Sequence, residues 1–261
     1  MLAVAIMKCY AINLDQSEDR LAHIIAEFAR IGAPFDRVAA IEASSVVPAP
    51  NLSHAETACF DSHRLCWQMI ADGDDPYASI FEDDIIFSES ARSLLTNDRW
   101  IPADADIVKL ETFFTPVRMD RRRTAIDDGL SVARMLGQHI GTAGYTLSRR
   151  AARNLLGWTK QIRGPVDFTI FSPLHMPCAR STVYQLTPAI CAQSQFVSET
   201  PFKTLIQYER PHRRTPLLEK LQHETSRAVA FFRSMTLRET EKVAVIFCPV
   251  RRLGLRNDSR P

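Results

Sequence analysis

The chain has 261 residues, of which 46% are hydrophobic and 24% are charged, an ordinary balance for a globular protein. Such a chain can bury one large core or two modest ones. Its formal net charge of +2 is too small to indicate nucleic-acid binding. No apolar run in the sequence approaches the roughly 20 residues that are needed to cross a bilayer.

Six cysteines without a Cys-x-x-Cys spacing indicate reduced thiols and a cytoplasmic location. On a helix, Cys59 and Cys66 would lie roughly 10 Å apart along the axis, which is too far for a disulfide. Residues 1–7 are apolar but follow no basic segment. They are therefore expected to form a first strand and not a signal peptide, and Met7 is an alternative start.

The first predicted elements are a strand from about residue 4 to 14, a helix ending before Gly32, and a strand at residues 35–41. A capping-box pattern at residues 15–18 opens the helix. Apolar residues follow at helical spacing, namely Leu21, Ile24, Ile25, Phe28 and Ile31. The order strand, helix, strand predicts an α/β fold with a parallel sheet.

A second helix is predicted after the proline-containing loop at residues 44–52, because Ser53 and Glu56 form another capping box. One face of this helix carries Cys59, His63, Cys66, Trp67 and Ile70. His63 is interpreted as a core histidine, a metal ligand or a diphosphate contact. Residues 77–81 then return as a central strand.

Glu82, Asp83 and Asp84 follow this strand directly and are the most informative feature of the chain. Repulsion and desolvation oppose burial of adjacent carboxylates unless positive charge compensates for them. Oxygen ligands of this kind suit Mg²⁺ or Mn²⁺, which hold phosphates. The alternative is a turn whose charges lie in water.

The next predicted elements are a strand at 106–111 and a polar segment at 118–128 that carries three arginines. This run of charge is interpreted as a solvated face or as an acceptor-binding loop. Small residues at 141–148 would let the backbone approach a ligand. A single carboxylate, Asp167, precedes an apolar stretch and could be a base or a helix cap. The last predicted strand covers residues 184–190.

In their order and spacing, these segments resemble glycosyltransferase family 25. These are the lipopolysaccharide and lipooligosaccharide glycosyltransferases, and their relatives include the procollagen galactosyltransferases. The similarity covers residues 8 to 195. The segments that carry it are YAINLD at 10–15 with Asp19 and Arg20, IGAPFDRVAA at 31–40, residues 56–63, SIFEDDI at 79–85, DIVKL at 106–110, GTAGYTLS at 141–148, and PVD at 165–167. Ala58 replaces a glycine of the family pattern. Nothing beyond about residue 200 is recognised, so acceptor preference does not follow.

The resemblance implies a GT-A-like nucleotide-binding α/β fold with a mostly parallel central sheet. A catalytic domain would cover residues 1–200, and a basic, mainly helical extension would cover residues 201–261. This extension either packs on the domain or touches an anionic membrane. The implied metal site for Mn²⁺ or Mg²⁺ is Glu82, Asp83 and Asp84. The implied donor-binding residues are Asn13, Leu14, Arg20, His63, Asp83, Gly144 and Tyr145. The implied catalytic base is Asp167.

The implied reaction is an inverting transfer of a hexose, with UDP-galactose as the expected donor, to a glycan or glycolipid acceptor. The enzyme would act in the cytoplasm, with peripheral contact at the inner face of the membrane if the acceptor is lipid-linked. One alternative is a non-catalytic nucleotide-sugar-binding or scaffold protein. Another is a different metal-dependent nucleotide-processing transferase. Such an enzyme would require a glycine-rich loop that binds phosphate, and the sequence contains no such motif.

Overall fold

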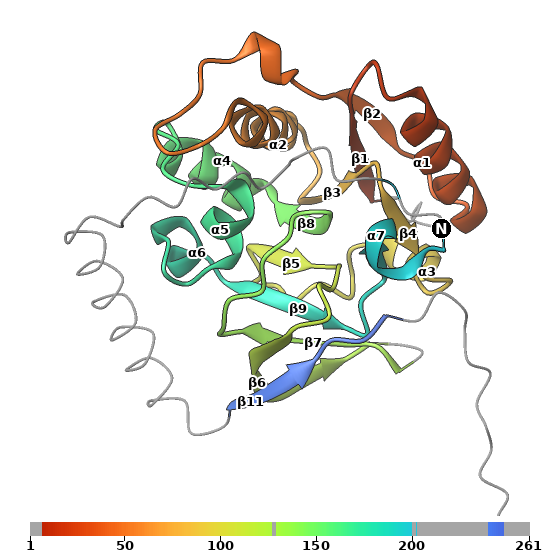
Figure 1. Ribbon diagram of the computed structural model, residues 1–261. Helices are drawn as coiled ribbons and strands as arrows, with labels where there is room; N and C mark the ends of the chain where they lie inside the picture. The colour runs from red at the N-terminus through yellow and green to blue at the C-terminus, as the bar shows by residue number, and fades with distance from the viewer. Residues whose placement is uncertain (1–6, 127–128, 200–201, 203–239, 248–261) are drawn as a thin grey trace, which may run out of the picture.

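The computed structural model describes residues 7–126, 129–199, 202 and 240–247 (Figure 1). Its strands are β1 (Lys8–Asn13), β2 (Asp36–Ala39), β3 (Tyr77–Glu82), β4 (Ile85–Phe87), β5 (Ile107–Lys109), β6 (Pro116–Ala125), β7 (Ser131–Met135), β8 (Gly144–Ser148), β9 (Val183–Thr187), β10 (Cys191–Gln193) and β11 (Thr240–Ala244). In this part of the chain the central sheet has the order β11-β6-β7-β9-β5-β8-β3-β1-β2. Strands β10 and β4 form a separate small sheet.

Most strands of the central sheet point the same way. The pairings give one direction to β1, β2, β3, β5, β6 and β9, and the opposite direction to β7, β8 and β11. The predicted α/β class with a mostly parallel central sheet is therefore confirmed. Strands β1 and β3 are parallel neighbours, so their carboxyl ends meet at one edge of the sheet. Strand β8 lies antiparallel between β3 and β5.

Helices cover both faces of the sheet (Figure 1). They are α1 (Glu18–Ile31), α2 (His54–Asp72), α3 (Ala91–Leu95), α4 (Arg149–Trp158), α5 (Val166–Phe171), α6 (Met176–Arg180) and α7 (Ser194–Val197), with a 3₁₀ turn η1 (Ala43–Ser45). Alternate residues of β1 enter different cores: Tyr10 and Ile12 pack with α2, whereas Cys9 and Ala11 pack with α1. Burial of both faces accounts for the continuous apolar character of the strands.

The two predicted capping boxes have different outcomes. At α2 the Ser53 hydroxyl accepts from the backbone N–H of Glu56, and the Glu56 carboxylate accepts from the N–H of Ser53, so this box is confirmed. At α1 the N-cap residue is Ser17, whose side chain makes no capping hydrogen bond. The helix still ends at Gly32 as predicted, because this residue has the left-handed φ of 64° that glycine tolerates.

The extension predicted for residues 201–261 lies mostly outside the described residues, so the boundary at residue 200 stays a prediction. Its described part is a strand and not a helix, because β11 pairs antiparallel with β6 at the end of the central sheet. The arginine-rich segment also lies here, on β6. Arg121, Arg122 and Arg123 are exposed there, and Arg123 contacts Glu241 of β11. This position at the far end of the sheet from β1 favours the interpretation as a solvated face.

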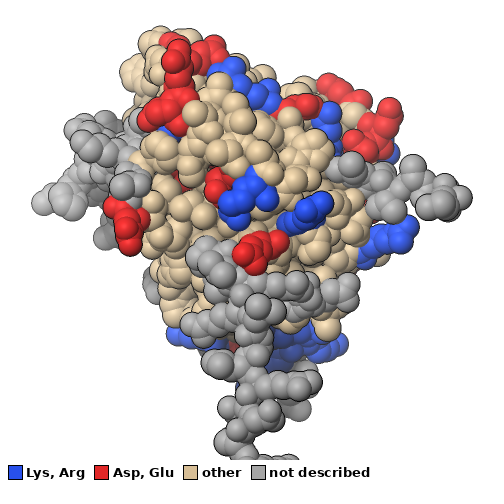
Figure 2. All heavy atoms as spheres, turned by 90° about the vertical axis from the view of Figure 1, so that its right-hand side faces the viewer, with Lys and Arg blue, Asp and Glu red and all other residues tan. Residues whose placement is uncertain are grey.

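On the face shown in Figure 2, basic and acidic side chains of the described residues are interspersed and do not form one basic patch. The cysteines at positions 9, 59, 66, 178 and 191 are all free thiols. Within the described part of the chain, no helix has the length and apolar content that a membrane span requires.

A buried ion pair lies at the end of β5, beside the segment that precedes β8. Neither Lys109 nor Glu111 is exposed to solvent, and Lys109 Nζ lies 2.8 Å from Glu111 Oε1. Lys109 also donates to the carbonyl of Gly141 and lies 4.2 Å from the centre of the Phe171 ring. Burial raises the pKa of Glu111, and the neighbouring ammonium group opposes that shift. The pair therefore ties the 141–143 segment to the core.

We expect Lys109→Met to lower the free energy of unfolding by about 3–5 kcal/mol, because it leaves a buried carboxylate without its counter-charge. The measurement is urea unfolding followed by circular dichroism. The double variant Lys109→Met/Glu111→Leu removes both charges and is expected to recover part of this loss. A double variant that is less stable than the single variant would contradict the ion-pair explanation.

Candidate active site

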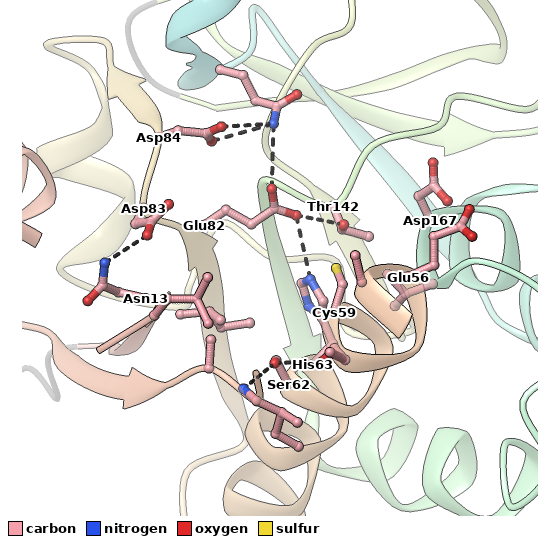
Figure 3. A pocket seen from close by; sticks show the side chains of 18 of the residues that line it. Asn13, Glu56, Cys59, Ser62, His63, Glu82, Asp83, Asp84, Thr142 and Asp167 are labelled. Atoms are coloured by element: carbon pink, nitrogen blue, oxygen red, sulfur yellow. Dashed lines mark hydrogen bonds and ion pairs between the residues drawn. The ribbon is translucent and has the colours of Figure 1, made fainter. Parts of the chain in front are cut away.

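A cavity of about 410 Å³ opens at the carboxyl ends of β1 and β3, between α1, α2 and α5 (Figure 3). This is the position at which open α/β sheets bind ligands. The lining residues that the argument uses come from seven segments of the chain: Asn13, Leu14, Arg20, Cys59, His63, Glu82, Asp83, Asp84, Phe113, Gly141, Thr142, Asp167, Gln193 and Gln195.

The acidic segment is a tight turn that joins the two sheets. Glu82 ends β3, Asp83 and Asp84 form the turn, and Ile85 begins β4. Ile85 and Phe87 are fully buried in the core beneath α1, so the chain must change direction at the two aspartates. Asp83 is 6% exposed and Asp84 is 7% exposed. The alternative of a turn with its charges in water is therefore wrong, because the flanking apolar residues pull the turn into the protein.

Asp83 is held on the α1 side of the cavity. Its carboxylate accepts from Arg20 Nη1 at 2.7 Å and from Asn13 Nδ2 at 2.8 Å. Arg37 in turn donates to the Asn13 side-chain oxygen and fixes the orientation of the amide. Buried charges persist when they are paired and hydrogen-bonded in this way. The predicted nucleotide-site residues Asn13 and Arg20 thus lie together, and Leu14 lines the same wall.

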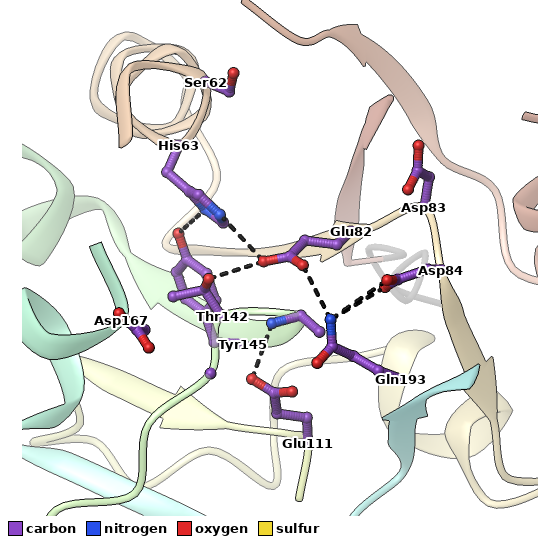
Figure 4. A network of polar contacts seen from close by, with 12 residues as sticks. Ser62, His63, Glu82, Asp83, Asp84, Glu111, Thr142, Tyr145, Asp167 and Gln193 are labelled. Atoms are coloured by element: carbon purple, nitrogen blue, oxygen red, sulfur yellow. Dashed lines mark hydrogen bonds and ion pairs between the residues drawn. The ribbon is translucent and has the colours of Figure 1, made fainter. Parts of the chain in front are cut away.

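Glu82 and Asp84 lie on either side of one amide group (Figure 4). Gln193 Nε2 is 3.5 Å from Glu82 Oε2 and 3.4 Å from both Asp84 oxygens. Burial raises the pKa of Asp84 to about 7, and the nearby Glu82 charge adds to this shift. Burial also opposes ionisation of Glu82, but its contacts with His63 and Thr142 lower its pKa overall. The site therefore has more buried negative charge than its described basic groups compensate.

His63 is buried and also lines the cavity. Its Nδ1 is hydrogen-bonded to the Tyr145 hydroxyl at 3.0 Å, and that hydroxyl accepts from Trp67 Nε1 at 2.8 Å. Because the phenol proton is then free to be donated, Nδ1 acts as the acceptor and Nε2 carries the ring proton towards Glu82 Oε1, 3.5 Å away. His63 therefore combines the core interpretation with the site interpretation.

The structure places Gly144 and Tyr145 behind the cavity wall and not in it. Tyr145 is fully buried, and its ring packs between His63 and Phe171. A Cβ atom at Gly144 would collide with the Cys191 sulfur, so the glycine permits β8 to approach β10. Both residues thus lie beneath the predicted site, and Tyr145 supports the site by holding His63.

Asp167 lies across the cavity from Asp83 and Asp84, as the two close views agree (Figures 3 and 4). It belongs to the first turn of α5, whose N-cap is Pro165, and its carboxylate accepts from the N–H of Phe168 at 2.8 Å. Burial raises its pKa, against hydrogen bonds from the backbone N–H groups of Phe168 and Gly141. Asp167 is therefore not the predicted helix cap, since α5 has no side-chain capping hydrogen bond, and its carboxylate faces the cavity.

The carboxylates of the acidic turn are the ligands that the sequence implies for a divalent cation. In the described residues, no three groups among His, Cys, Asp and Glu lie close enough to hold a metal by themselves. Mg²⁺ and Mn²⁺ are, however, commonly held by one or two carboxylates together with substrate phosphates. Glu82 and Asp84 fit this requirement, because one donor already lies between them and their negative charge is poorly compensated. Asp83 does not join them, since it faces Arg20.

Three lining residues were missed by the sequence reasoning. Thr142 donates to Glu82 Oε1 at 2.8 Å, Gln193 lies between the acidic side chains, and Phe113 closes the cavity near Gly141. Thr142 lay within the recognised glycine-containing segment, which was a usable signal. Gln193 and Phe113 reach the site only through the pairing of β10 with β4 and the turn after β5, which no local pattern reveals.

The shifted carboxylate predicts a pH-dependent stability. The folded-state pKa of Asp84 exceeds its ordinary value of 3.8, so ionisation destabilises the fold progressively as pH rises from about 4 to 7. In a chelating buffer, Asp84→Asn is expected to match the wild type near pH 4 and to melt at a higher temperature at pH 8. One pKa unit corresponds to about 1.4 kcal/mol. Thermal melts across this range test the effect, with exposed Asp75→Asn as the charge-matched control. A difference that does not change with pH would contradict it.

Comparison with known proteins identifies relatives over nearly the whole chain. Residues 6–170 match the model of glycosyltransferase family 25, described as an LPS biosynthesis protein. The chain is 31% identical over 268 residues to the lacto-N-neotetraose biosynthesis glycosyltransferase LgtB of Neisseria meningitidis serogroup B, covering 91% of this chain and 94% of the relative. It is 29% identical over 204 residues to the lipooligosaccharide biosynthesis protein lic2B of Haemophilus influenzae, covering 70% and 75%.

Among solved structures, the chain is similar to a glycosyltransferase involved in the glycosylation of the major capsid of PBCV-1. The two are 8% identical with a TM-score of 0.42, and the similarity covers 74% of this chain and 93% of that chain. The family match covers more than half of the sequence and includes the β1, acidic-turn and 141–142 segments that line the cavity. The chain therefore belongs to glycosyltransferase family 25 and is a glycosyltransferase of lipopolysaccharide or lipooligosaccharide biosynthesis.

Proposed function

We propose that the protein is an inverting, metal-dependent hexosyltransferase that uses UDP-galactose to extend a lipopolysaccharide or lipooligosaccharide glycan. One observation carries the mechanism: the acidic turn and Asp167 face the same cavity from opposite sides (Figure 3). Inversion by a single displacement requires the leaving group and the attacking hydroxyl on opposite faces of the sugar. The names of the relatives, which refer to lacto-N-neotetraose and lipooligosaccharide biosynthesis, support this acceptor class.

The donor would bind at the β1 side of the cavity. Asn13 and Leu14 line the wall for the nucleotide, and Arg20 supplies a guanidinium that suits phosphate oxygens. Glu82 and Asp84 would hold Mn²⁺ or Mg²⁺. When bound, this cation would supply positive charge that stabilises the departing diphosphate. His63, fixed by Tyr145 and Trp67, directs a ring N–H at Glu82 and keeps that carboxylate in place.

The acceptor would bind at the α5 side, where Asp167 can take the proton from its hydroxyl. A base works best when its pKa lies closer to the operating pH than that of a free carboxylic acid. Burial raises the pKa of Asp167 in this direction. As the hydroxyl oxygen bonds to the anomeric carbon, its proton passes to Asp167, and the bond to the UDP oxygen breaks.

The proposal includes a cytoplasmic location, since the described cysteines are free thiols, as is usual in a reducing compartment. A lipid-linked acceptor would bring the protein to the inner face of the cytoplasmic membrane. The competing function is a scaffold that binds a nucleotide sugar without turnover. Incubation with UDP-sugars, Mn²⁺ and a panel of acceptors distinguishes the two, because any catalysed sugar transfer excludes the scaffold.

Asp84→Asn is expected to reduce metal-dependent hydrolysis of UDP-galactose by roughly 10²–10³-fold, the usual loss when one electrostatic stabiliser is removed. Released UDP is measured over a titration of Mn²⁺. Asp75→Asn removes one exposed carboxylate and serves as the matched control. Unchanged turnover in Asp84→Asn would reject the metal assignment.

Asp167→Asn is expected to reduce sugar transfer by roughly 10²–10⁴-fold, the contribution typical of general-base catalysis. The amide keeps the size of the side chain but cannot accept the proton. Binding of UDP to the variant, measured by calorimetry with Mn²⁺, is expected to stay within twofold of the wild type. Near-normal transfer would assign the base to another residue.

A further inference from the structure

Three aromatic side chains form a cluster that reaches the cavity through Phe113. Phe113 lines the cavity, and its ring lies edge-to-face with Phe196 of α7 at 4.7 Å between centroids. Phe114 lies 6.1 Å from Phe196. Phe114 and Phe196 are each 42% exposed, and none of the three belongs to either buried core cluster. We call Phe113, Phe114 and Phe196 the aromatic rim.

The turn that carries Phe114 is strained and is held from two sides. Phe114 has a φ of 56°, in a region that bulky residues rarely adopt and that costs about 1–3 kcal/mol. The Thr112 hydroxyl accepts from the N–H of Phe114 and donates to the carbonyl of Val245, which follows β11. A contact with the remote residue Val245 therefore helps to hold the exposed Phe114 in an unfavourable conformation.

The Phe113 backbone is fixed by a second set of contacts. Its N–H donates to His139 Nε2 at 3.3 Å, and His139 Nδ1 lies 2.8 Å from Gln185 Oε1. Burial lowers the pKa of His139 to about 4, so the ring is neutral and can accept through Nε2. Gln185 is itself fully buried and donates to the carbonyls of Lys109 and Glu111. The backbone of Phe113 is thus fixed to β5 and β9 through His139 and Gln185.

Gly141 connects the rim to the proposed base. A Cβ atom at this position would lie 3.0 Å from the Phe113 ring, and the backbone N–H of Gly141 hydrogen-bonds to Asp167. The Phe113 ring and the Asp167 carboxylate therefore both adjoin Gly141. Asn13 and Asp83 lie at the other end of the cavity from Asp167 (Figure 3), and Arg20 contacts Asp83.

We propose that the aromatic rim is the acceptor subsite and takes the pyranose ring of the acceptor's terminal sugar. This inference rests on the proposed function. The C–H bonds on one face of a pyranose ring pack well on the electron-rich face of an aromatic ring. Gln195, beside Phe196 and also lining the cavity, offers an amide for the sugar hydroxyls. The sugar would lie with one hydroxyl directed past Gly141 at Asp167.

The experiment compares Phe196→Leu, which keeps apolar surface, with Phe196→Tyr, which keeps the aromatic ring. Transfer from UDP-galactose is measured against p-nitrophenyl glycosides of glucose, galactose and N-acetylglucosamine, and against deacylated lipooligosaccharide. The acceptor that the wild type uses fastest is then titrated with each variant. Ile25→Ala, at an exposed apolar position on α1, is the control. Release of UDP in the absence of acceptor reports donor use separately.

Phe196→Leu is expected to raise the acceptor KM by about 3- to 10-fold, the range for loss of one aromatic contact. Its UDP release without acceptor should match the wild type, and Phe196→Tyr should keep the wild-type KM. An unchanged acceptor KM in Phe196→Leu would overturn this inference but not the proposed function. The same holds for a wild type that releases UDP but transfers to no glycoside. A wild type that releases no UDP from any UDP-sugar would contradict the proposed function, and the inference with it.

Discussion

Three successive carboxylates, the partly exposed Glu82 and the buried Asp83 and Asp84, lie where the chain passes from the large sheet to the small one. Arg20 lies 2.7 Å from Asp83 and 3.6 Å from Asp84, and it holds the pair against their mutual repulsion. The compensation is incomplete, since burial and Glu82 still raise the pKa of Asp84. The cavity therefore keeps negative charge that Arg20 does not compensate, and both α1 and β10 contact the turn that carries it.

The supports of the site form layers behind it. Trp67 and Tyr145 orient His63, His63 and Thr142 orient Glu82, and the Lys109–Glu111 pair holds the segment that carries Gly141 and Thr142. Trp67, His63, Tyr145 and Lys109 are buried on a helix or a strand, whereas Thr142 lies on the short 141–143 segment. A site held in this way loses little conformational freedom when a substrate binds, which favours precise positioning over adaptability.

The sequence predicted those parts of the site that adjoin local patterns. An apolar strand followed by Glu82 to Asp84, and the Ser53 capping box, predicted the acidic edge and α2, and the structure confirms both elements. Residues brought in by long-range pairing escaped prediction. Gln193 arrives through β10. Tyr145 was predicted to bind the donor, but it lies beneath His63 because β8 inserts antiparallel beside β3. The capping box predicted at residues 15–18 is wrong, because α1 begins at Glu18 and its N-cap, Ser17, makes no side-chain capping hydrogen bond.

The contact between Thr112 and Val245 joins groups 133 positions apart in the chain. During synthesis, the acidic turn can assemble once β1 to β4 and α1 have left the ribosome. The Phe114 turn, by contrast, waits for a carbonyl that lies 133 positions further along the chain than Thr112. The segments of the acidic turn would thus be synthesised long before the Phe114 turn is braced.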